Sequence, residues 1–202
     1  MASLSTFVKL AAGLLAGFEV FKRIGGNDFL LRPPGAGTEK EYLSKCIRCG
    51  KCVAACTYRI LHAAPAGSGV NAGTPYFVAR DAACKLCEDF PCIAACPTGA
   101  LGGIENRREV RIGTAVINRD YCIALNGIRC EVCFRSCPLN GDAISIKHSP
   151  RPGDNIHTIF EPVVNADNCV GCGICEERCV ISDPVLAIRV TPHLGIHAFP
   201  EQ

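Results

Sequence analysis

The sequence predicts an α+β fold of short strands and short helices joined by many loops, arranged as two similar modules behind a hydrophobic N-terminal helix. Three observations lead to this prediction. The 16 cysteines fall into four groups of four. Short apolar runs, which are typical of strands, flank the two later groups. Stretches rich in Gly and Pro, such as residues 63–73 and 99–103, are typical of loops.

The spacing within the fourth cysteine group indicates the function of all four groups. Two residues separate Cys169 from Cys172 and Cys172 from Cys175, and Cys179 follows after three more. A short loop through the first three cysteines can aim three thiolates at one point, and Gly171 lets that loop bend tightly. In bacterial-type ferredoxins this spacing holds a [4Fe–4S] cluster, and the fourth cysteine ligates the other cluster of a pair. Gly50 and Gly173, like Gly171, are the expected donors of backbone N–H groups to sulfur.

Similar groups of four cysteines occur four times, and together they include every cysteine in the chain. The second group has two more residues in its middle gap, and the third has a long first gap. The groups are Cys46, Cys49, Cys52 and Cys56; Cys84, Cys87, Cys92 and Cys96; Cys122, Cys130, Cys133 and Cys137; and Cys169, Cys172, Cys175 and Cys179. Sixteen thiolates, which also act as the iron ligands, suit four [4Fe–4S] clusters. A [3Fe–4S] site at the irregular third group is a less favoured alternative.

Two other uses of cysteine have to be weighed. Neighbours spaced C-x2-C-x2-C cannot all form disulfides with one another, and structural zinc sites take two separated C-x2-C pairs instead of a run of three. We therefore favour iron–sulfur clusters over a disulfide-linked or zinc-binding structural protein.

The arrangement of the four groups is a separate question. Pro follows the last cysteine of the second and third groups only, which favours a nested arrangement of second with third and first with fourth. The expected ligand sets are Cys84, Cys87, Cys92 and Cys137; Cys130, Cys133, Cys96 and Cys122; Cys46, Cys49, Cys52 and Cys179; and Cys169, Cys172, Cys175 and Cys56. This predicts an outer module from residues 38–60 and 160–190 and an inner module at 76–147, both within a double ferredoxin domain at 28–202. A sequential arrangement stays open.

An internal repeat supports the ferredoxin-like fold. Apolar runs at Thr114–Ile117 and Pro162–Val164 each lead through an Asn-x-Asp turn into a cysteine group. Asp142–Ile146 and Val185–Val190 follow those groups as second strands. Each unit thus predicts a strand, a cluster loop, a short helix and a strand, and two such units form the small antiparallel sheets of a bacterial-type 2[4Fe–4S] ferredoxin.

Residues 1–27 predict an amphipathic, hydrophobic helix. Its uncharged run, Leu10–Phe18, is shorter than the about 20 apolar residues that span a bilayer. We expect this helix to lie on a membrane or to dock on a membrane subunit; a signal-peptide core and a helix packed on its own domain are the alternatives. Arg32–Gly37 predicts an extended linker before the globular part, and Glu39–Lys45 a short helix.

Composition excludes several other functions. Lys and Arg number 21 against 19 Asp and Glu, without the basic clusters of a nucleic-acid surface, so no nucleic-acid partner is expected. No GxxxxGK[ST], GxSxG or HExxH motif is present, and no catalytic site for a substrate is predicted. An enzyme that binds substrate at one cluster would need a cluster that lacks a ligand, and the full set of cysteines disfavours that alternative.

Several longer motifs resemble the NapG/MauM group of ferredoxin-type proteins, which is related to the four-cluster subunits of molybdopterin oxidoreductases. They are Leu31–Ala36, Cys46–Cys56, Gly73–Asp81, Cys84–Cys92 and Gly127–Pro138, and the similarity spans about residues 31–190. The resemblance implies an electron carrier, associated with the periplasmic face of a bacterial cytoplasmic membrane. It also implies the nested cluster arrangement, which the related four-cluster subunits have.

The expected function is therefore the relay of single electrons through four [4Fe–4S] clusters in a quinol-linked respiratory complex. The implied partners are a membrane quinol dehydrogenase-type subunit and a cytochrome or reductase subunit. The electron-transfer subunit of a molybdopterin oxidoreductase is the alternative. One departure concerns the route of export, because no twin-arginine pair precedes the hydrophobic run, as the group's usual signal would require.

Overall fold

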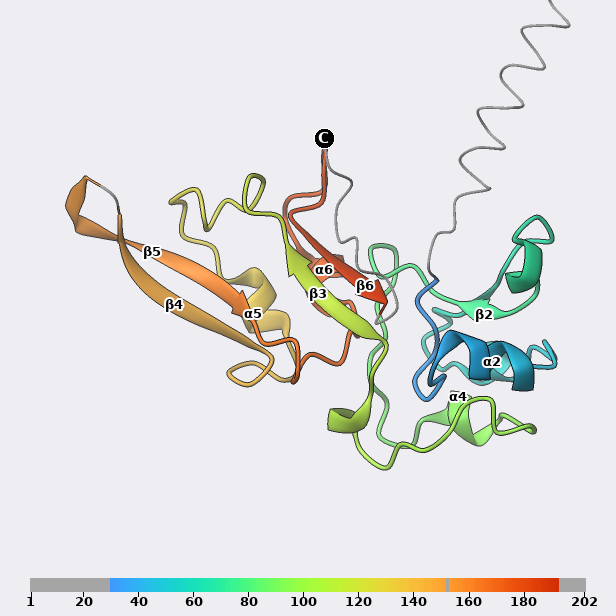
Figure 1. Cartoon of the computed structure of the whole chain (residues 1–202). Helices are drawn as coiled ribbons and strands as arrows, with labels where there is room; N and C mark the ends of the chain where they lie inside the picture. Colours follow the sequence, from blue (N-terminus) through green and yellow to red (C-terminus); the bar gives the residue numbers. More distant parts are fainter. Residues whose placement is uncertain (1–29, 152, 193–202) are drawn as a thin grey trace, which may run out of the picture.

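The computed structural model describes residues 30–151 and 153–192 and shows a loop-rich arrangement of short helices and strands (Figure 1). The helices are α2 (Glu39–Lys45), α3 (Lys51–Ala55), α4 (Pro91–Ala94), α5 (Val132–Ser136) and α6 (Ile174–Arg178), with 3-10 turns η1 (Gly69–Asn71) and η2 (Arg107–Glu109). The strands are β1 (His62–Ala63), β2 (Pro75–Tyr76), β3 (Gly113–Ile117), β4 (Ile144–Arg151), β5 (Asp154–Val164) and β6 (Ile188–Pro192). The mixed, loop-rich α+β class predicted from the sequence is confirmed.

The hydrophobic helix predicted for residues 1–27 lies outside the described residues. Within the described ranges, every helix is too short or too polar to cross a lipid bilayer.

The second half of the chain contains the predicted repeat. β3 pairs antiparallel with β6, with Ala115 opposite Val190, and β4 pairs antiparallel with β5, with Ile144 opposite Val164. The first strand of one unit thus joins the last strand of the other, while the two middle strands form a hairpin. This exchange ties the third and fourth cysteine groups into one body, since β3 precedes the third group and β6 follows the fourth.

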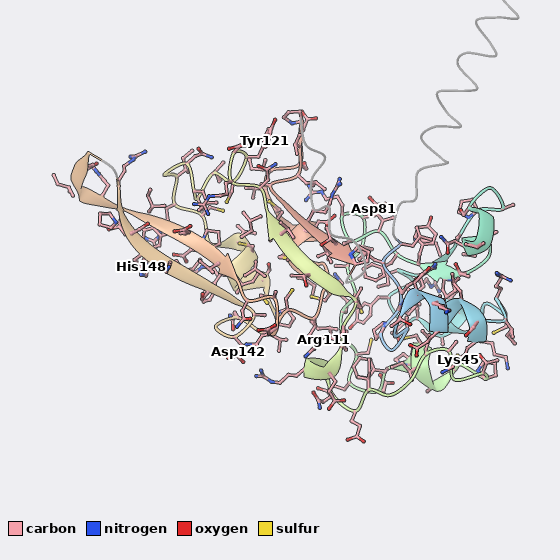
Figure 2. All side chains as sticks on the ribbon, in the orientation of Figure 1. Lys45, Asp81, Arg111, Tyr121, Asp142 and His148 are labelled. Atoms are coloured by element: carbon pink, nitrogen blue, oxygen red, sulfur yellow. The ribbon has the colours of Figure 1, made fainter. Side chains whose placement is uncertain are left out.

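The first half has little sheet. β1 and β2 pair over two residues each, and α3 packs against α4. α2, α4 and β2 lie at one end of the molecule, the β4–β5 hairpin lies at the other, and β3, β6 and α6 stand between them (Figure 1). The side-chain view places Lys45 of α2 and His148 of β4 at these opposite ends (Figure 2).

The segment Arg32–Gly37 is not the linker that its prolines suggested. Leu31 forms a bridge with Phe77, and the Arg32 guanidinium donates hydrogen bonds to Thr74 Oγ1 at 2.7 Å and to the Pro75 carbonyl oxygen at 3.0 Å. The chain turns at Pro34 and Gly35, and residues 31–34 are buried in the first half of the fold. The prediction of a linker was wrong because a sequence pattern does not show which distant acceptors bind the guanidinium of an arginine.

Candidate iron–sulfur centres

Glycines with a positive φ turn the chain between the cysteine loops and the helices that follow them. Gly50 begins α3 with φ +73° and Gly173 begins α6 with φ +85°, so the chain turns sharply from the loop into the helix. Such φ values cost a residue with a Cβ about 1–2 kcal/mol. The turn places Cys52 and Cys175 in the first helical turn, next to the loop that carries the two preceding cysteines.

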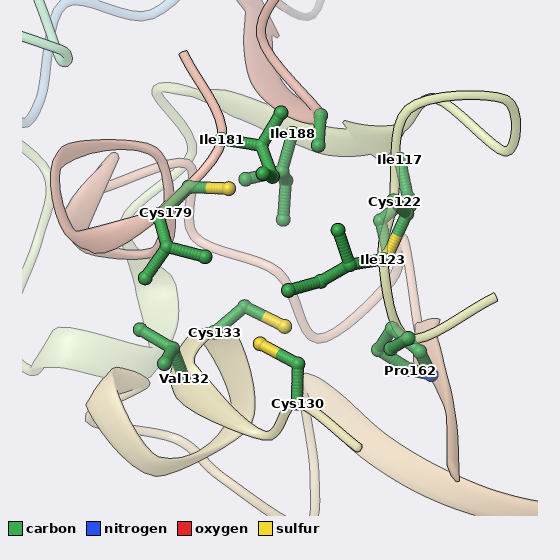
Figure 3. A pocket seen from close by; sticks show the side chains of 13 residues that line it. Ile117, Cys122, Ile123, Cys130, Val132, Cys133, Pro162, Cys179, Ile181 and Ile188 are labelled. Carbon is green, nitrogen blue, oxygen red and sulfur yellow. The ribbon is translucent and has the colours of Figure 1, made fainter. Parts of the chain in front are cut away.

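One cysteine site is visible as a cavity in the second half of the chain (Figure 3). Cys122, Cys130, Cys133 and Cys179 line it. About 390 Å³ of space, part of it open to solvent, lies between these sulfurs and apolar side chains such as Ile123, Val132 and Ile188. Three ligands come from the third cysteine group and the last from the fourth group.

Two further cavities lie in the first half, and each again draws its fourth cysteine from the neighbouring group. The ligand sets are Cys84, Cys87, Cys92 and Cys56, around about 380 Å³ of space, and Cys46, Cys49, Cys52 and Cys96, around about 310 Å³. Both volumes include space that is open to solvent.

The fourth site gathers Cys169, Cys172 and Cys175 with Cys137. Burial, together with the neighbouring Cys137 and Cys169 thiols, raises the pKa of Cys172 to about 11. Burial and the proximity of Cys169 likewise raise the pKa of Cys137. The backbone N–H of Ala115 on β3 donates to Cys169 Sγ at 3.5 Å, so the central sheet contributes directly to this site.

The cysteine groups are therefore arranged sequentially, first with second and third with fourth, and the nested prediction was wrong. Cys56 joins Cys84, Cys87 and Cys92, where Cys137 was expected. The outer module of 38–60 and 160–190 and the inner module of 76–147, which followed from nesting, do not match these ligand sets. The physical cause is helix packing: α3 lies on α4 and α5 lies on α6, so the last cysteine of each group, just after its helix, reaches the loop of the adjacent group. A proline after that cysteine marks the end of the helix and says nothing about its partner.

The donor sets fit iron–sulfur clusters better than the two alternatives. All 16 cysteines lie in the described part of the chain, and every one has a free thiol, so the disulfide interpretation fails. Across residues 30–151 and 153–192, no three His, Cys, Asp or Glu side chains converge closely enough to hold a single metal ion. Four thiols that line one cavity without converging on a single point suit a cluster better than one zinc ion.

Burial also determines the protonation state that the thiols have before they bind iron. It raises the pKa of Cys84 to about 12 and that of Cys133 to about 12, with neighbouring cysteines adding to the effect. Such thiols are neutral near pH 7, and iron binds the thiolate, so cluster binding displaces protons.

Two arginines that the sequence analysis did not predict as functional hold parts of the fold around the cluster sites together. Arg80 donates to the carbonyl oxygens of Glu176 and Cys179 at 2.9 Å each and of Glu177 at 3.3 Å, which caps the end of α6 from the other half of the chain. Arg32 was placed in a linker. The only sequence signal for either residue is its presence in a motif shared with a family. The acceptors of Arg80 lie 96 or more residues away and two acceptors of Arg32 lie 42 and 43 residues away, so neither contact has a local signature.

Two pairs of cluster sites on a fold of repeated strand–loop–helix units define a ferredoxin-type electron carrier with two dicluster domains. A family model described as "4Fe-4S dicluster domain" matches residues 45–100 and 126–182, which are the two sequential halves found here. The chain belongs to the NapG/MauM family of ferredoxin-type proteins and is an iron–sulfur electron-transfer protein that holds four [4Fe–4S] clusters.

The relatives cover most of the chain. It is 47% identical over 164 residues to the ferredoxin-type protein NapG of Escherichia coli (strain K12), covering 80% of this chain and 70% of that protein. It is 42% identical over 169 residues to the methylamine utilization ferredoxin-type protein MauM of Paracoccus denitrificans, covering 82% and 73% respectively. A third relative, the ferredoxin-type protein NapF of Escherichia coli (strain K12), is 30% identical over 155 residues, covering 75% and 81%.

Proposed function

We propose that this protein relays single electrons along four clusters in a quinol-linked respiratory complex at the periplasmic face of a bacterial cytoplasmic membrane. In this proposal a membrane quinol dehydrogenase-type subunit stands at one end of the relay and a cytochrome or reductase subunit at the other. Similarity to NapG and MauM proteins supports the proposal, and the order of the four sites in the fold is the observation that carries it.

The sites form a sequence whose end sites hold the more accessible cysteines. Cys49 is the one exposed cysteine of the 16, and it belongs to the site at the α2 end of the molecule. Every cysteine at the opposite terminal site, which includes Cys122 and Cys179, is partly exposed. Cys84 and Cys172, in the two middle sites, are each 7% exposed. Buried cysteines predominate in the two middle sites, so electron partners have better access to the ends.

The chain itself joins the two middle sites. The backbone N–H of Cys84 donates to the Cys172 carbonyl oxygen at 2.9 Å, and the Lys85 ammonium pairs with Glu177 at 2.6 Å across the same junction. Each [4Fe–4S] cluster, when bound, supplies a one-electron couple whose potential depends on burial, charge and hydrogen bonds to sulfur.

Purification in mild detergent with native partners attached tests this function. The expected result is co-purification with a polytopic iron–sulfur subunit, and reduction of the clusters by a quinol added to that complex. A cluster spectrum that stays oxidised with quinol in the intact complex would overturn the quinol link. Co-purification with a molybdopterin-containing subunit alone would replace the proposed complex by the molybdopterin oxidoreductase alternative.

A further inference from the structure

Tyr42 carries a buried hydroxyl group without a partner. Its side chain, on α2, is 1% exposed. Within the described residues its hydroxyl is the one buried side-chain nitrogen or oxygen atom that has no hydrogen-bond partner. Buried tyrosine hydroxyls normally find a partner, because leaving one unpaired costs the free energy of its lost hydration. An unpaired hydroxyl in so well paired a fold indicates that its acceptor is in place only when a further group is bound beside it.

The position of the ring is fixed from one side by Arg32. The guanidinium carbon of Arg32 lies 5.0 Å from the centre of the Tyr42 ring, in a cation–π contact. Arg32 is held in turn by the Glu39 carboxylate, Thr74 Oγ1 and Asn71 Oδ1. A guanidinium has no acceptor atom, so Arg32 orients the ring and leaves the hydroxyl proton unbound.

On its other side Tyr42 faces a cluster site. It lines the cavity whose cysteines are Cys46, Cys49, Cys52 and Cys96. The Cys46 N–H donates to the Tyr42 carbonyl oxygen at 2.9 Å, which places the two residues one helical turn apart and on one face. A phenol carries its proton near pH 7, so the hydroxyl can donate to an electron-rich acceptor in this cavity.

We propose that the Tyr42 hydroxyl donates a hydrogen bond to a sulfur atom of the cluster at this site, Cys46 Sγ or a sulfide, and raises the reduction potential of that cluster. Reduction makes the sulfurs more negative, so a donated hydrogen bond stabilises the reduced state more than the oxidised one. The inference depends on the bound cluster and is independent of the partners proposed above.

The chain offers a contrast in a second cavity. Tyr58 lines the cavity of Cys56, Cys84, Cys87 and Cys92, but it is 57% exposed. Water can satisfy an exposed hydroxyl, so Tyr58 needs no sulfur acceptor. Tyr58→Phe is therefore the matched control: it removes the same oxygen beside a different cluster.

The test uses the anaerobically purified holoprotein with all four clusters. Potentiometric titration followed by electron paramagnetic resonance is compared for the parent protein, Tyr42→Phe and Tyr58→Phe, and Cys49→Ala identifies the signal of the cluster near Tyr42. We expect Tyr42→Phe to shift that one potential to a more negative value, with the other three unchanged, and Tyr58→Phe to shift none. In D₂O, electron–nuclear double resonance of the same cluster loses one exchangeable deuterium coupling in Tyr42→Phe.

A second variant keeps the test decisive if Tyr42→Phe fails to retain its cluster. Replacement of Tyr42 by 3-fluorotyrosine keeps the ring and makes the hydroxyl a stronger donor, so the same potential shifts to a more positive value. An unchanged potential in the fluorotyrosine protein, or an unchanged potential and deuterium coupling in a fully loaded Tyr42→Phe protein, would overturn the proposal.

Discussion

The backbone N–H of Cys84 donates a hydrogen bond to the carbonyl oxygen of Cys172 at 2.9 Å. These two cysteines ligate different clusters, in the two different dicluster halves. A Cβ on Gly173 would contact Ala79 at 2.5 Å, so the loops on either side of this hydrogen bond also approach closely. The two halves are therefore joined through the cluster-binding loops themselves, and the contact that connects them also sets how close the two middle clusters lie.

The first prediction concerns Arg80, which links the halves. Because its guanidinium donates to three carbonyl oxygens at the end of α6, we expect Arg80→Gln to lower the free energy of unfolding of the holoprotein by about 2 kcal/mol. Anaerobic urea unfolding measures this loss. Arg178→Gln, at an exposed position on the same helix, is the control and should change stability by less than about 0.5 kcal/mol. Equal losses in the two variants would contradict the assignment.

The sequential ligand sets make a second prediction, based on counting clusters. Cys137→Ala should remove one cluster, about four of 16 iron atoms. Adding Cys175→Ala should remove no further cluster, because both cysteines ligate the same one, whereas adding Cys92→Ala should remove a second. Iron analysis and the number of paramagnetic signals measure the count. A nested arrangement would give the reverse, with Cys92 and Cys137 removing one cluster together.

The sequence predicts the ligands and the local units well, because both depend on short-range patterns. The spacing of Cys169 to Cys179 fixes a cluster loop and the start of a helix, and the strands around it follow from apolar runs. What it cannot predict depends on contacts between distant residues. The partner of Cys137 is decided by which helix lies beside α5, and the burial of Arg32 by acceptors about 40 residues away. Residues such as Tyr42 and Arg80 gain a role only from these long-range contacts.

A third prediction tests the close approach of Gly171 to the backbone of Gly113. Gly171 has φ +69°, and a Cβ there would overlap the backbone of Gly113 at the start of β3. Gly171→Ala should therefore destabilise the protein by about 3 kcal/mol, combining backbone strain with steric overlap, and should weaken the cluster at Cys169, Cys172 and Cys175. Thermal unfolding and iron content measure both effects.

The matched control for that substitution is Gly141→Ala. Gly141 has φ +86° but nothing within 4 Å of the added Cβ, so only the backbone strain, about 1–2 kcal/mol, is expected. If both variants lose the same stability and retain all four clusters, the contact between Gly171 and Gly113 has no structural role.

The last prediction concerns pH. Burial raises the pKa of Cys84 to about 12, and burial with nearby thiols raises that of Cys172 to about 11, above the about 8.5 of an exposed thiol. In the folded apoprotein the neutral thiols are thus favoured, so their contribution to stability is complete below about pH 8.5 and is lost as pH rises through 11–12. In the holoprotein iron replaces those protons, so this loss of stability at high pH should be absent.

Loading with iron must then release protons, and the affinity for iron should rise with pH by up to about tenfold per unit for each buried thiol. Competition with an iron chelator at pH 7 and pH 8, with proton release followed by an indicator dye, measures both effects. An iron affinity that stays constant between these values would show that the thiols are already ionised before the clusters bind.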